Sequence, residues 1–272
     1  MRLAISNLAW DAAEDTEVAA MLGEFGVNAI DVVPGKYFPT PQEVEDAAIK
    51  RVKQWWAERS IEITGMQALL FGASGLNLFG EAAVQEAMLT RLRSICRIGA
   101  GLGARRLVFG SPRNRDRSGL SDAQALEQAV TFFRRLGDIA QAYGVVICLE
   151  PNPVEYGANF MTNSQETAAV VTALSHPAIK MQFDTGAMTL NGEKPEEVLK
   201  AYAHLIGHVH ISEPHLAPIG DGETDHRAAR DALQRYLPEH VIAIEMAATK
   251  DEPHTASIQR ALARAVAWYC AS

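Results

Sequence analysis

Cysteine is scarce in this sequence. Three cysteines occur in 272 residues, Cys96, Cys148 and Cys270, and all three lie far apart in apolar stretches. An odd number of isolated cysteines argues against a disulfide framework and against a cysteine-rich zinc site. Free cysteine commonly packs as a small hydrophobic side chain, so we expect reduced thiols in the protein core.

Long apolar runs are also missing. The N-terminal stretch MRLAISNLAW stays apolar for only a few residues before Asp11, which is too short for a signal peptide or a membrane-spanning helix. No tract rich in proline, glycine or serine divides the chain. We therefore expect a cytoplasmic protein with no membrane partner and a single domain over residues 1–272.

An excess of positive charge is absent as well. The chain has 25 Lys and Arg against 33 Asp and Glu, which gives a net charge of −8. Nucleic-acid binding depends on clustered Lys and Arg, so this balance excludes nucleic acid as a partner and favours small-molecule chemistry. A hydrophobic content of 48% in a chain of this length suits one large architecture such as a barrel.

Four apolar stretches in the second half of the chain each end at a side chain that can bind a metal ion. VVICLE ends at Glu150, IKMQFD at Asp184, HVH at His210 and VIAIE at Glu245. The intervals between them are 34, 26 and 35 residues, each about one strand, loop and helix of a barrel of roughly 250 residues. Strand-like and helix-like patterns alternate along the whole chain, which predicts an α/β fold, a single (β/α)8 TIM barrel.

In such a barrel the carboxyl ends of the strands meet at one mouth, where the chemistry takes place. The four side chains should therefore converge there. Three carboxylates and one imidazole form a mostly oxygen site that suits a divalent Mn, Mg or Co ion, with Zn as a further candidate.

The motifs LEPNP, FDTG, HVHISEP, IGDGETD and IEM resemble the sugar phosphate isomerase/epimerase family of xylose-isomerase-like barrels. That family includes ketose 3-epimerases, hydroxypyruvate isomerase and inosose dehydratase. The resemblance implies that Glu150, Asp184, His210 and Glu245 hold one divalent metal ion, manganese among the candidates. It further implies that Glu150 and Glu245 face opposite sides of a substrate carbon and move protons through a cis-enediolate. The expected activity is isomerisation or epimerisation of a keto sugar or related polyol.

Five further residues are candidates for contact with a carbohydrate-like substrate. His208 lies two residues before His210 and is either a polar core residue or a partner that orients a metal ligand. Glu213 either corresponds to a family carboxylate just after the histidine or is a solvated or hydrogen-bonded loop residue. His215 could supply a hydrogen-bond donor. Arg113 could hold a phosphate or carboxylate, or pair with nearby acids on an exposed loop. Trp10 is either a wall for sugar stacking or a packing residue.

The sequence departs from the family pattern at three positions. Ala187 stands where many members have a histidine after the aspartate, and Leu216 replaces an arginine that follows the metal histidine. Ketose 3-epimerases have a glutamate six residues after the first ligand, but here that position is Tyr156, with Glu155 one residue earlier. We therefore expect free ketohexoses to be poor substrates.

Two questions stay open at this point. The loop ALLFGASGLNLFG, residues 68–80, is apolar enough to cover the mouth as a lid, to pack on a neighbouring loop, or to join a second copy of the chain in a homo-oligomer. The chemistry could also be that of a metal-dependent dehydratase, a lyase acting on a keto-polyol. A third reading is a catalytically silent ligand-binding barrel, since fold alone does not fix function.

Overall fold

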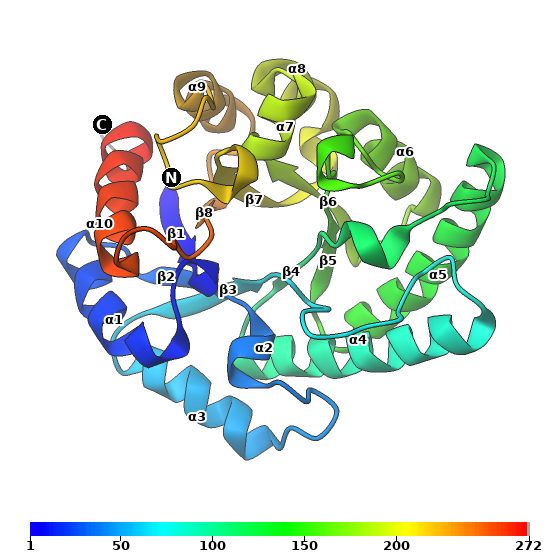
Figure 1. The fold of residues 1–272 in the computed structure, drawn as a ribbon, viewed down its shortest axis with the longest axis horizontal. Coiled ribbons are helices and arrows are strands. Elements are labelled where there is room, and N and C mark those ends of the chain that lie inside the picture. The colour runs from blue at the N-terminus through cyan, green and yellow to red at the C-terminus, as the bar shows by residue number, and fades with distance from the viewer. Residues whose placement is uncertain (271–272) are drawn as a thin grey trace.

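The computed structural model describes residues 1–270, and these form a closed parallel barrel in which β1 pairs with both β2 and β8. Each strand hydrogen-bonds to the next in sequence order (Figure 1). The predicted (β/α)8 TIM barrel is thereby confirmed. The strands are β1 (Arg2–Ser6), β2 (Ala29–Val32), β3 (Glu62–Met66), β4 (Arg106–Phe109), β5 (Val146–Leu149), β6 (Ile179–Asp184), β7 (Ile206–Ser212) and β8 (Val241–Glu245).

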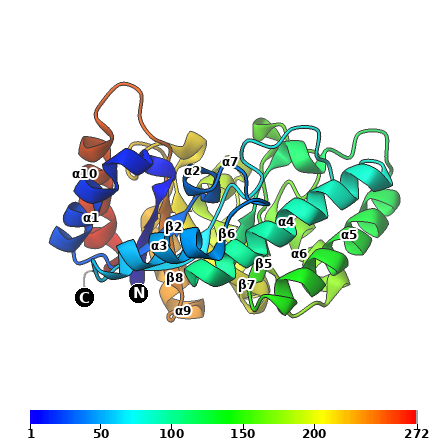
Figure 2. The ribbon, with the colours of Figure 1, turned by 90° about the horizontal axis from the view of Figure 1, so that it is seen from below.

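Helices surround the barrel and follow the strands in alternation (Figure 1). Two of them, α2 and α7, are short helices that come directly after β2 and β6, in addition to the eight expected from sequence. In Figure 2 they lie on the opposite face from the N-terminus. The helices are α1 (Asp15–Glu24), α2 (Pro34–Tyr37), α3 (Asp46–Ala57), α4 (Ala82–Leu102), α5 (Asp122–Ala142), α6 (Ser164–Leu174), α7 (Thr185–Asn191), α8 (Pro195–Tyr202), α9 (His226–Tyr236) and α10 (His254–Ala265).

Local sequence explains where several helices begin. Ser121 and Gln124 form a capping box at the start of α5, and the side chains of Asn163 and Asp225 accept hydrogen bonds from the first turns of α6 and α9. The capping-box spacing of Thr40-Pro41-Gln42-Glu43, with proline at the first helical position, predicts a helix that begins at Thr40, and this prediction is wrong. Residues 40–43 form a turn, and α3 begins only at Asp46, because the Thr40 carbonyl accepts from Glu43 in an isolated turn.

Side chains alternate between the barrel interior and the layer between strands and helices, as the pleat of a strand requires. The outward-facing strand residues pack with the helices in one continuous hydrophobic core. The inward-facing residues include a small cluster of Ala4, Ala29 and Ala243, and above it the polar side chains of β2, β6, β7 and β8. Within residues 1–270, no helix is long and apolar enough to cross a membrane.

Candidate metal centre and active site

Four side chains from consecutive strands meet at the mouth of the barrel. Glu150 comes directly after β5, Asp184 ends β6, His210 lies in β7 and Glu245 ends β8. One ligand atom from each of these residues lies within 4.8 Å of the others. The His210 Nδ1 atom is 3.2 Å from Glu245 Oε2, 3.4 Å from Glu150 Oε1 and 3.9 Å from Asp184 Oδ2. The structure thus brings together the four residues expected to bind metal.

The charges of this cluster fit a cation. All four residues are buried or nearly so, and the buried Glu150 Oε1 atom has no hydrogen-bond partner among the described residues. Burial, together with the negative charges of Glu245 and Glu150, raises the pKa of Asp184 well above its ordinary value. Burial also opposes charge on Glu245, but the His210 ring outweighs it and lowers the pKa of Glu245. Three crowded carboxylates and one imidazole are a donor set for one divalent ion.

Neighbouring groups hold two of the carboxylates in place. Asp184 Oδ1 accepts a hydrogen bond from the Ala187 backbone N–H at 2.7 Å, and its Oδ2 atom accepts from the Ser212 hydroxyl at 2.9 Å. The Gln67 amide, at the end of β3, donates to Glu245 Oε1 at 2.5 Å. Each of these two carboxylates thus has oxygens with fixed partners, which pre-orients the acidic side chains.

Glu150 is held by a buried arginine acting partly through an amide. Arg115 is fully buried, and its guanidinium donates to the Glu150 carbonyl at 2.7 Å and to Asn152 Oδ1 at 2.6 Å. Asn152 in turn donates to Glu150 Oε2 at 3.3 Å. Burial lowers the pKa of Arg115 to about 10, so the side chain still carries its charge at neutral pH. The sequence does not reveal this role, because Arg115 lies in the same arginine-rich loop as Arg113 and looks equally suited to bind an anion.

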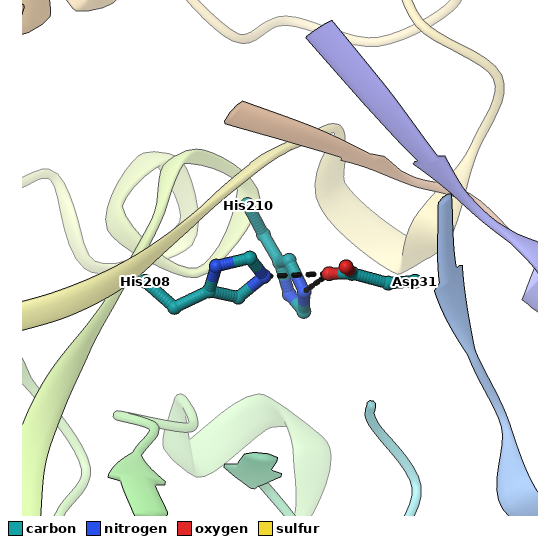
Figure 3. Close-up of side chains that lie close together, drawn as sticks. All are labelled: Asp31, His208 and His210. Atoms are coloured by element: carbon teal, nitrogen blue, oxygen red, sulfur yellow. Dashed lines mark hydrogen bonds and ion pairs between the residues drawn. The ribbon is translucent and has the colours of Figure 1, made fainter. Parts of the chain in front are cut away.

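Asp31 and His208 form a second polar group next to His210 (Figure 3). The Asp31 carboxylate, from β2, reaches across the barrel to two histidines of β7. Its Oδ2 atom is 2.5 Å from His208 Nε2 and 3.8 Å from His210 Nε2, and its Oδ1 atom accepts from Thr64 at 2.9 Å. Burial opposes the charge on Asp31, but the two histidines more than offset it and lower its pKa.

This arrangement gives His210 two distinct sides. Its Nδ1 atom faces the carboxylates at the mouth, and its Nε2 atom lies on the side of Asp31, beyond hydrogen-bond distance of that carboxylate. Asp31 was missed in the sequence, although a single acid within the apolar strand NAIDVV was a usable signal.

A cavity of about 1140 Å³ opens above the metal ligands. Among the residues expected to contact substrate, Glu213, His215 and Arg113 line it. Glu213 is also engaged by the protein, since its carboxylate accepts from the backbone of Gly220 and Thr224 and contacts His226.

The other two candidates lie elsewhere. His208 is bound to Asp31 in the barrel interior, and Trp10 is fully buried with its indole N–H donating to Asp15 at 2.8 Å. Neither belongs to the cavity wall.

The departures from the family pattern sit in the cavity wall. Ala187, Leu216 and Tyr156 all line it. Tyr156 accepts a hydrogen bond from the His215 backbone at 2.7 Å, and His215 Nε2 lies 3.2 Å from Glu155. His215 and Leu216 both have positive φ, at 58° and 57°, a conformation that is strained for side chains of their size. The protein therefore holds this turn in one shape at the rim of the cavity.

Solved structures of sugar enzymes share this fold. D-psicose 3-epimerase with D-tagatose from Clostridium cellulolyticum H10 has a TM-score of 0.81 and 17% identity, covering 99% of each chain. 3-Keto-D-glucoside 4-epimerase, YcjR, from E. coli has a TM-score of 0.79 and 18% identity, covering 97% of this chain and 98% of the other. At such low identities the likeness concerns the fold.

A curated sequence relative matches over a shorter stretch. Inosose dehydratase from Clostridium botulinum (strain Alaska E43 / Type E3) is 30% identical over 79 residues, which is 29% of this chain and 25% of that protein. The aligned segment thus spans a quarter of that dehydratase. The model of the xylose isomerase-like TIM barrel family matches residues 19–268, nearly the whole chain. Together with the closed eight-stranded barrel, this match shows that the chain belongs to the xylose isomerase-like TIM barrel family.

Proposed function

We propose that this protein is a divalent-metal-dependent isomerase or epimerase of a keto sugar or related polyol. The observation that carries the proposal is the pair Glu150 and Glu245, which reach the same histidine nitrogen from different strands at the floor of a large cavity. Sugar epimerases of the same fold and the partial match to an inosose dehydratase support a carbohydrate substrate.

Glu150, Asp184, His210 and Glu245 would hold the ion, which we propose is Mn, Mg or Co, with Zn as an alternative. When bound, the ion stabilises negative charge that develops on a carbonyl oxygen of the substrate. Each glutamate has a second oxygen besides the one nearest His210. That oxygen can accept a proton from a carbon next to the carbonyl or return one to it.

The proton transfers then follow from the placement of the two acids. One glutamate removes the proton from the carbon between a ketone and a hydroxyl, and the product of this step is a cis-enediolate. The other returns a proton to the opposite face and so inverts the carbon. Arg115, Asn152 and Gln67 keep the two carboxylates in position during these steps.

Deuterium exchange tests this proposal directly. The metal-loaded protein is incubated in D₂O with a panel of keto sugars, inososes and keto-glycosides, and incorporation at carbon is followed by NMR. Glu150→Gln and Glu245→Gln should each lower the exchange rate by 10²-fold or more, the usual contribution of a general base. Glu62→Gln is the matched control, because Glu62 begins β3 at the far end of the barrel and pairs with Arg2 on the surface. Exchange at full rate in either active-site variant would remove that glutamate from the mechanism.

A dehydratase is the second candidate, and the partial match to inosose dehydratase favours it. The first step would be the same removal of a proton from the carbon next to the ketone. If a hydroxyl group then leaves from the next carbon, the substrate loses water and the carbon is not inverted. Mass spectrometry of the same incubations distinguishes the two, because only the lyase product is lighter by one water. A silent binding barrel would give neither deuterium incorporation nor a change of mass.

A further inference from the structure

The cavity is lopsided with respect to the metal ligands. Those ligands come from β5 to β8, whereas the loop after β3 (residues 67–77) and the end of β4 with the loop after it (residues 108–114) supply most of the wall. The cavity therefore extends from the metal ligands across the barrel mouth to the loops on the other side. A bound molecule has room beyond the atoms that the acidic residues can reach.

The size of the cavity exceeds what a free sugar needs. Its volume of about 1140 Å³ lies slightly above the roughly 300–1,000 Å³ found for pockets that hold drug-sized ligands. A free ketohexose is much smaller than such a ligand. It would leave the part of the cavity beneath the β3 and β4 loops filled only with water.

The wall of that part is apolar. Leu70, Phe71 and Leu76 of the loop after β3 line it, together with Pro112 of the loop after β4. Phe71 is 63% exposed, a large hydrophobic side chain left at the rim. Water is poorly accommodated at such an apolar surface. Burying an apolar group against it is favourable by about 25 cal/mol per Å² of apolar surface removed from water.

Two amide side chains in the same wall are engaged by the protein. Asn114 donates to the Leu76 carbonyl at 2.7 Å, and Asn77 donates to the Asp116 carbonyl at 2.8 Å. Both amides therefore fix the loops and are not available to sugar hydroxyls. The exposed Arg113 is the charged side chain in this part of the wall.

We propose, resting on the function proposed above, that the substrate is a keto sugar carrying an apolar substituent, such as an aryl or alkyl glycoside. The keto sugar lies at the metal ligands, and the substituent lies under residues 69–76 against Leu70, Phe71, Leu76 and Pro112. Ala187 and Leu216 fit this assignment, because their methyl groups offer no partner to the extra hydroxyls of a free ketohexose.

Binding of a matched pair of ligands tests the substituent separately from catalysis. The manganese-loaded protein is titrated calorimetrically with phenyl and with methyl 3-keto-β-D-glucopyranoside, which differ only in the substituent. The phenyl compound should bind at least about tenfold more tightly, a factor that corresponds to about 1.4 kcal/mol. Equal affinities, or no binding of either compound, would overturn the inference.

Two variants in the loop after β3 test where the substituent binds. Phe71→Ala and Leu76→Ala should each shrink the phenyl preference, with unchanged affinity for the methyl compound. Val154→Ala is the control, because Val154 is 70% exposed and lies outside the cavity wall. A phenyl preference that survives both loop variants would overturn the proposed position of the substituent.

A phosphorylated ligand tests whether this part of the cavity binds an anionic substituent instead of an apolar one. If methyl 3-keto-β-D-glucopyranoside 6-phosphate binds more tightly than the phenyl compound, and Arg113→Gln removes that advantage, this part of the cavity binds an anion and the inference fails. The proposed function fails in a different way. A clear phenyl preference with no deuterium exchange in any compound would refute the enzyme and leave the apolar subsite, whereas exchange with equal affinities would do the reverse.

Discussion

Gly110 directly follows β4 and passes close to the first predicted metal ligand. A Cβ atom built at this position would lie 1.9 Å from Glu150 Oε2 and 3.0 Å from its Cδ atom. Since real Cβ atoms do not approach other heavy atoms within 3.0 Å, Gly110→Ala must displace the Glu150 carboxylate oxygen by at least about 1.1 Å. Gly110 does not have a positive φ, so alanine can adopt its backbone conformation without strain.

A shift of this size should separate activity from stability. Displacement of a catalytic group by about 1 Å can cost on the order of 10²-fold in rate. We therefore expect Gly110→Ala to lower kcat/KM for deuterium exchange by on the order of 10²-fold, and to weaken manganese binding. The barrel should stay folded, because the group that must move is the end of a flexible side chain.

The assay combines exchange kinetics, manganese titration and thermal unfolding on the same preparations. Gly23→Ala is the matched control, since Gly23 lies in α1 with nothing within 4 Å of the added methyl group. Alanine is favoured over glycine in a helix interior by about 1 kcal/mol, so this control should be equally active and no less stable. The reasoning is refuted if Gly110→Ala keeps more than about a tenth of the wild-type rate.

Four further outcomes are expected. Chelation should abolish activity and lower the unfolding temperature by calorimetry, because an ion bound only by the folded state stabilises it by about 2.7 kcal/mol at 100 times its Kd; a chelated sample with full activity would contradict this. Manganese affinity should fall with falling pH across the range in which the protein stays folded, because the raised pKa of Asp184 lets protons compete with the ion at higher pH than for an ordinary aspartate; a pH-independent affinity in a titration across that range would count against this carboxylate as a ligand. Arg115→Met should lower the free energy of unfolding in denaturant by about 1–3 kcal/mol, because Asn152 and the Glu150 carbonyl lose a buried donor. The same variant should lower kcat more than it changes KM, and an unchanged kcat would make the role of Arg115 purely structural. Free ketohexoses such as fructose or tagatose should have low kcat/KM, and Ala187→His should raise it by restoring a polar partner; efficient turnover in the wild type would refute this.

Much of the fold and of the metal ligand set follows from local patterns in the sequence. Strand-like runs alternate with helical spacing, and capping residues such as Ser121 and Asn163 mark helix starts that the structure has at the same positions. A closed barrel is the simplest architecture that turns eight such repeats into buried parallel strands. Because that architecture gathers the strand ends at one mouth, a sequence reader can expect Glu150 and His210 to meet.

Tertiary structure alone decided which polar residues support the site and which merely lie near it in sequence. Asp31 and His208 are 177 positions apart and pair only because the barrel closes. Arg115 and Arg113 are two positions apart and look alike in sequence, yet one is fully buried beneath Glu150 and the other is exposed in the cavity wall. Periodicity shows which face of a strand a side chain occupies. It carries no information on how far a loop side chain reaches or on which distant partner it finds, because those depend on contacts across the barrel that form only in the folded chain.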